Sequence, residues 1–168
     1  MVVGWNIFPY VAVVAVLFSL LGAVVALRSK ERSSMAMLLT GLGIATMALF
    51  IVGLWITLSR PPLRTMGETR LWYSFFLLLA GLFTYGRWRY RWIMLFATIL
   101  ATVFIVINIL KPEIHDQTLM PALQSFWFVP HVSVYMFSYS LFGCATLLTI
   151  VAMVRPQSDV DAAIERLI

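Results

Sequence analysis

Long, uninterrupted apolar blocks are the feature of this sequence that most constrains its fold. Most of them are about twenty residues long, the length that a helix needs to cross a hydrocarbon core of roughly 30 Å. Barrel strands would alternate between apolar and polar residues, so the blocks predict helices that satisfy their own backbone hydrogen bonds. The predicted helices cover residues 7–27, 35–58, 71–85, 92–110 and 132–154. We expect an all-α, polytopic membrane helix bundle in which residues 1–168 form one domain and residues 155–168 a cytoplasmic tail.

Composition supports a membrane protein and narrows the function classes. Hydrophobic residues make up 62% of the chain and charged residues 11%, against about 25% charged residues in a soluble domain. No predicted helix has a charged residue in its middle, which argues against an ion-coupled transporter. The chain shows no phosphate-binding glycine loop, no paired carboxylates within a helix and no cysteine pair. A soluble type of catalytic site is therefore not predicted, and a small-molecule permease is disfavoured.

Basic residues are distributed unequally between the two sides of the predicted bundle. Of the 12 Lys and Arg residues, eight lie on one side and four, in residues 60–70 and 111, on the other. Since cytoplasmic loops carry the excess of Lys and Arg, the N-terminus and residues 111–131 are predicted to lie outside the cell's inner (plasma) membrane. The net charge of +5 is then an orientation signal and gives no indication of nucleic-acid binding.

Small residues indicate where the predicted helices can approach one another. Gly22 and Ala26 have the small-xxx-small spacing, as do Gly41 and Ala45. We expect both pairs to lie at helix contacts.

His131 is the candidate ligand in this chain, which has only two histidines. It follows the segment PALQSFWFVP and is predicted to open the last helix, with Pro130 as a helix-start residue. Helical spacing then places the side chains of a single stripe below it, namely Tyr135, Ser138, Phe142 and Thr149. An imidazole beside the rings of Phe126, Trp127 and Phe128 can ligate haem iron, with the rings as apolar walls. Three outer arginines, Arg60, Arg64 and Arg70, can bind the propionates because guanidinium grips carboxylates in a bidentate manner.

Ordinary structural roles also account for these residues. Aromatic side chains and histidine collect at membrane interfaces without any ligand, and the stripe can be a helix-packing face. The outer arginines can contact lipid phosphates in a solvated loop. His115 lies in the polar segment KPEIHDQ, and we expect it to be exposed to solvent.

Two motifs add a resemblance to these patterns. RPPLRTMGETRLWYSF (residues 60–75) and PALQSFWFVPHVSVYMFSYSLF (residues 121–142) resemble the cytochrome c assembly proteins of the CcsA/ResC type, the membrane haem handlers of System II. In that family the aromatic segment precedes the first outward-facing haem ligand, which corresponds to His131. The family loop P-x-x-T-x-x-E-x-x-x-aromatic corresponds to Pro61 or Pro62, Thr65, Glu68 and Trp72 with Tyr73.

The resemblance implies a function in cytochrome c biogenesis. Family members export haem b and present it to apocytochrome c on the outer face, where thioether bonds form. The implied partners are the large outer-domain Ccs/Res subunit, apocytochrome c and membrane lipid, with no nucleic acid. The family's W-x-W-D loop is absent here, and residues 132–168 contain no second histidine. We therefore expect the chain to be the N-terminal portion of such a protein, which joins a holocytochrome c synthase system with the remaining half of the haem handler and is inactive alone. The alternative is a non-catalytic membrane subunit that docks or assembles a cytochrome complex.

Overall fold

The computed structural model describes residues 3–29, 33–115, 125 and 127–154, and this part of the chain is helical. Its elements are α1 (Phe8–Arg28), α2 (Ser34–Leu58), α3 (Met66–Trp88), α4 (Arg91–Leu110), the short 3-10 helix η1 (Pro112–His115) and α5 (Phe128–Val154). The predicted all-α class is confirmed, and each long helix covers one predicted apolar block. Among the described residues, α1, α2 and α4 are long and apolar enough to cross a membrane.

The largest departure from the predicted boundaries is at α3. This helix begins at Met66 rather than at residue 71 and ends at Trp88 rather than at residue 85. A capping box sets its start, because Thr65 Oγ1 accepts a bond from the Glu68 N–H (3.2 Å) and Glu68 Oε2 accepts one from the Thr65 N–H (3.1 Å). Hydrogen bonding in the first turn, and not the edge of the apolar block, therefore decides where α3 begins.

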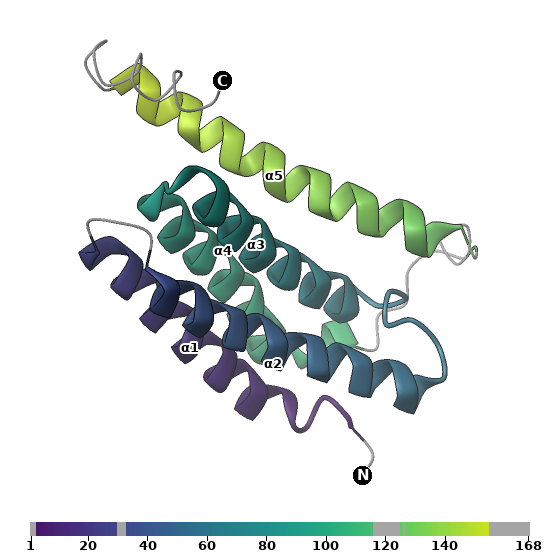
Figure 1. Ribbon diagram of the computed structural model, residues 1–168. Helices are drawn as coiled ribbons and strands as arrows, with labels where there is room; N and C mark the ends of the chain where they lie inside the picture. The colour runs from purple at the N-terminus through teal and green to yellow at the C-terminus, as the bar shows by residue number, and fades with distance from the viewer. Residues whose placement is uncertain (1–2, 30–32, 116–124, 126, 155–168) are drawn as a thin grey trace.

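The helices form a core of four with a fifth on its outside (Figure 1). Short connections make successive helices from α1 to α4 antiparallel neighbours. α1 packs along α2 and α3 along α4, and further contacts join α1 to α4 and α2 to α3. α5 lies mainly against α3, with a smaller contact to α4. The face of α5 that points away from α3 is thus not covered by the other helices that the structure describes.

Glycines let α1 and α2 approach closely. A Cβ on Gly22 would lie 2.9 Å from the Ala36 carbonyl oxygen and against the Thr40 hydroxyl. Gly43 mirrors this arrangement, since its Cβ would meet the Ser19 hydroxyl. Each helix therefore places a small hydroxyl side chain over a glycine of the other, a packing that larger residues would prevent.

The predicted small-residue contacts are correct on α1 and wrong on α2. Gly22 and Ala26 are buried, as expected. Gly41 instead faces open space, and Ala45 is exposed. The contact runs through Gly43 instead. The prediction failed because α2 is apolar on every side, so its hydrophobicity does not mark the face that packs.

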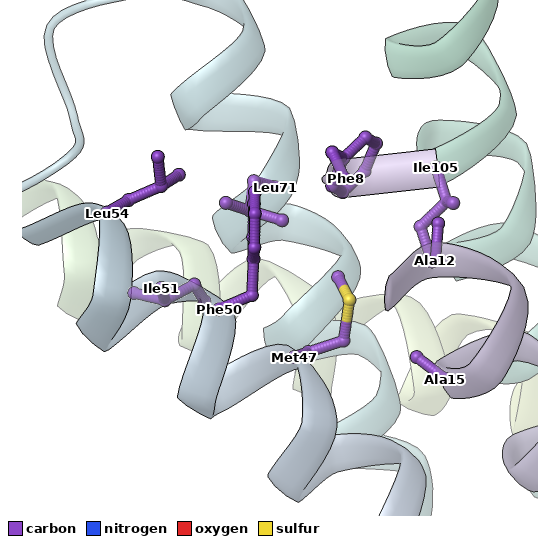
Figure 2. Close-up of a cluster of buried hydrophobic side chains, with 9 residues drawn as sticks. All are labelled: Phe8, Ala12, Ala15, Met47, Phe50, Ile51, Leu54, Leu71 and Ile105. Carbon is purple, nitrogen blue, oxygen red and sulfur yellow. The ribbon is translucent and has the colours of Figure 1, made fainter. Parts of the chain in front are cut away.

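An apolar cluster of all four core helices supports the end of the bundle where α1 begins (Figure 2). Its members are Phe8, Ala12, Ala15, Met47, Phe50, Ile51, Leu54, Leu71 and Ile105. Trp5 extends the cluster with edge contacts to Phe8 (5.3 Å) and Phe50 (6.0 Å). The loop between α2 and α3, η1 and the start of α5 lie at this same end.

Candidate functional site at the start of α5

His131 lies in the first turn of α5 with its side chain exposed. The helix begins at Phe128, earlier than the predicted residue 132. Pro130 fits in this first turn because the N–H groups there have no partner within the helix, so its missing N–H costs nothing. The His131 N–H donates to the Trp127 carbonyl (3.3 Å). The imidazole therefore projects from a formed helical turn.

The predicted stripe below His131 lies in an open, shallow groove along α5, whose described lining residues all belong to residues 125–142. His131, Tyr135, Ser138 and Phe142 all line this groove, which is open to the outside and has a volume of about 1030 Å³. Thr149, the last member of the predicted stripe, is exposed farther along α5 and is not among the described lining residues.

Aromatic rings follow one another along the groove. The His131 ring meets the Tyr135 ring edge-on, with centroids 4.4 Å apart. Tyr135 stacks in turn on Tyr139 at 5.7 Å. The predicted stripe does not include Tyr139, although this residue follows Tyr135 by four residues and so lies beside it on the next helical turn.

The groove residues point away from the bundle. Trp127 is 75% exposed, Tyr139 58% and Phe142 73%, so they do not belong to the core of the chain. The opposite side of α5 packs inward through Met136, which is 1% exposed, and through Phe137. Trp127 lines the groove, whereas Phe126, which was predicted beside it, lies outside the described residues.

The Arg60 guanidinium is paired with a carboxylate of its own chain. Its Nη1 and Nη2 donate to Glu68 Oε2 (3.0 Å) and Oε1 (2.9 Å), a bidentate pair with a carboxylate that is 2% exposed. The backbone N–H of Arg64 also donates to Glu68 (2.6 Å). This carboxylate thus holds the loop before α3 in one shape.

The other two predicted propionate partners have different surroundings. The Arg64 side chain is exposed. Arg70 is half-buried, and its Nη1 has no hydrogen-bond partner among the described residues. None of the three arginines is among the described residues that line the groove.

Aromatic contacts connect the loop before α3 to α5. The Trp72 indole N–H donates to the Pro62 carbonyl (2.9 Å), and Trp72 stacks on Phe76 with centroids 5.4 Å apart. Phe76 then meets Phe137 of α5 edge-on at 6.0 Å. The two motifs that carry the family resemblance are therefore joined through packed rings.

His115 is not simply exposed to solvent, so this prediction is wrong. Its ring stacks on Trp5 with centroids 3.8 Å apart and planes 9° from parallel, and it lies against Gly67 of α3. Asn108, which is fully buried, donates to the Gly67 carbonyl (3.1 Å). The cause is η1, which turns the chain after α4 back onto the start of α3.

Within the described ranges, no group of three His, Cys, Asp or Glu side chains is placed to hold a metal ion. His131 alone offers one nitrogen ligand, far fewer than the four ligands of a typical protein metal site. Haem iron already has four porphyrin nitrogens, so a single histidine can complete its coordination on one side.

Comparison with known proteins adds no relative: no protein-family model, curated protein or solved structure matches the chain.

Proposed function

We propose that this chain is a membrane haem-handling subunit for cytochrome c biogenesis, which presents haem b to apocytochrome c. The observation that carries the proposal is the exposed imidazole of His131 at one end of an open groove walled by aromatic rings. The contact between the two family-like motifs, through Trp72, Phe76 and Phe137, gives further support.

Four groove residues have roles in this proposal, namely Trp127, His131, Tyr135 and Phe142. His131 ligates the haem iron, and Trp127 and Phe126 wall the porphyrin. Tyr135 and Phe142 offer further ring and hydroxyl surface along α5, which suits a flat macrocycle. Haem is here the cargo, and the chain supplies a ligand and an apolar surface for it.

Among the arginines, Arg64 and Arg70 are the better partners for the propionates. Glu68 already occupies the guanidinium of Arg60 with two hydrogen bonds. Using Arg60 would leave a buried carboxylate without its cation, which is costly. We therefore expect Arg60 to stabilise the loop between α2 and α3 and not to bind a propionate.

The proposal includes five membrane-spanning helices with the N-terminus outside the inner (plasma) membrane. This orientation places His131 and the loop of residues 59–65 on the outer side, where apocytochrome c would meet the haem. The outer-domain Ccs/Res subunit and the remaining half of the haem handler would complete the site. The thiols that form the thioether bonds belong to apocytochrome c, so this chain by itself catalyses no step.

Haem titration of the purified chain in lipid nanodiscs tests the ligand. We expect a Soret band, shifted between the oxidised and reduced states, that His131→Ala abolishes and added imidazole restores. His115→Ala is the matched control, because it removes the other histidine and should leave the band in place. Equal bands in the wild type and His131→Ala would exclude His131 as the ligand.

A docking subunit is the second candidate, and the high exposure of Trp127 and Tyr139 favours it. Exposed aromatic residues are typical anchors of protein interfaces. If His131→Ala leaves cytochrome c maturation intact in cells while Trp127→Ala abolishes it, the groove binds a protein partner and the haem proposal fails.

A further inference from the structure

The end of the bundle opposite the His131 groove carries only positive charge among the residues that the structure describes. Arg28 ends α1, Arg87 lies in the last turn of α3, Arg89 follows that helix and Arg91 begins α4. The acidic side chains that the structure describes, Glu68 and Glu113, belong to the start of α3 and to η1, at the other end.

Hydrogen bonds join the helix ends that carry these arginines. Arg91 Nη1 donates to the carbonyls of Leu27 (3.5 Å) and Ser29 (2.7 Å), which joins the start of α4 to the end of α1. The Ser33 N–H donates to the Tyr85 hydroxyl (3.0 Å), which joins the start of α2 to the end of α3. The positive end is thus built by four helices and does not depend on one flexible loop.

Three of the four arginines have no ion-pair partner among the described residues and can bind an external anion. Arg28, Arg87 and Arg89 are exposed, and none forms an ion pair with another described residue. Arg89 caps α3 in the left-handed conformation, with φ of 60°. The guanidinium of Arg87 lies over the Trp88 ring, 5.7 Å from its centroid, a contact that leaves its N–H donors available.

The position of this cluster indicates the kind of anion. α1 and α4, whose ends carry Arg28 and Arg91, are long and apolar enough to cross a membrane, so their ends lie at the depth of the lipid headgroups. Trp88, Tyr90 and Trp92 stand between and beside the arginines, as aromatic residues do at membrane interfaces. A phospholipid can pair its phosphate with guanidinium groups there while its acyl chains follow the apolar helices.

We propose that Arg28, Arg87 and Arg89, which lie at the same end of the bundle, form a binding site for the headgroup of an anionic phospholipid beside the end of α1, the end of α3 and the start of α4. Clustered cations repel one another, and a bound phosphate relieves this repulsion. The site is independent of the haem proposal, because it lies at the other end of the bundle and uses none of the groove residues.

Lipid binding to the full chain in neutral detergent tests this site. Native mass spectrometry would compare phosphatidylglycerol with phosphatidylcholine for the wild type and for Arg87→Gln/Arg89→Gln. Since each basic residue at an anionic membrane surface favours binding about fivefold, the double variant should lose about thirtyfold of its preference for phosphatidylglycerol. Arg60 and Arg91 remain unchanged, because both hold the fold together.

Two controls separate charge from folding. Arg64→Gln removes an exposed arginine at the opposite end and should leave the preference unchanged. Arg87→Lys/Arg89→Lys keeps the charge and should keep most of the preference, so a loss in this variant equal to that of the glutamine variant would overturn the charge mechanism.

The remaining outcomes are equally decisive. No preference of the wild type for phosphatidylglycerol, or the same preference in the glutamine variant, would overturn the proposal. If inorganic phosphate displaces the lipid at equal concentration, the site binds free phosphate and the assignment to a lipid is wrong.

Discussion

Gly67 is a position where a single methyl group should disturb the fold around η1. A Cβ there would lie 2.5 Å from Cδ2 of His115 and 3.4 Å from its Cα. The His115 ring cannot simply tilt away, because Trp5 stacks on it at a centroid distance of 3.8 Å. Gly67→Ala therefore forces η1 and the segment before α1 to move.

The cost follows from three contributions. Overpacking of a well-packed site costs about 1–3 kcal/mol, and loss of the ring stack adds about 0.5–1.5 kcal/mol. The helix propensity of alanine returns at most about 1 kcal/mol, and less at the second residue of a helix. We expect Gly67→Ala to lower the free energy of unfolding by about 0.5–4.5 kcal/mol.

Gly86→Ala is the matched control. Gly86 lies in the same helix, and no atom stands within 4 Å of its added Cβ. The same substitution should leave stability unchanged or raise it by up to about 1 kcal/mol. The two variants thus differ in the sign of the effect while their chemistry is identical.

Reversible unfolding in mixed micelles, followed by circular dichroism as the fraction of sodium dodecyl sulfate rises, measures both variants. The double variant Gly67→Ala/His115→Ala removes the clash, so it should be no less stable than His115→Ala alone. If Gly67→Ala proves as stable as the wild type, or if the double variant shows the full sum of both losses, the reasoning from this contact is refuted.

The same unfolding assay tests three further positions. Arg60→Ala should lower the free energy of unfolding by about 1–3 kcal/mol because the buried Glu68 carboxylate loses its cation. Arg64→Ala removes only an exposed side chain and should change it by less than about 0.5 kcal/mol. Equal effects of the two variants would contradict the contribution of the ion pair. Ser59→Gly should stabilise the end of α2 by up to about 1 kcal/mol, since Ser59 has φ of 51°; a loss of stability would contradict this. Trp72→Phe, which removes the hydrogen bond to the loop and part of the packed ring surface, should cost at least about 0.5–1.5 kcal/mol, and no change would show that neither contributes.

Local patterns made part of the site predictable. Backbone groups in an apolar solvent must find partners within their own helix, so the apolar blocks were sufficient to predict the places of the long helices. The stripe from His131 through Tyr135 and Ser138 to Phe142 followed from helical periodicity alone, and these residues do share one groove.

The sequence by itself therefore determined the helices and which residues share a face of α5, because both depend on local geometry. Only the tertiary structure decided which face of α2 packs, that Arg60 pairs with Glu68 and that Trp5 covers His115. Helices that are apolar on all sides carry no hydrophobic signal for their contact face, so steric fit at glycines such as Gly22 and Gly43 selects it. Likewise, the partner of a charged or aromatic side chain depends on which segment folding brings beside it. The neighbouring residues in the sequence therefore do not predict that partner.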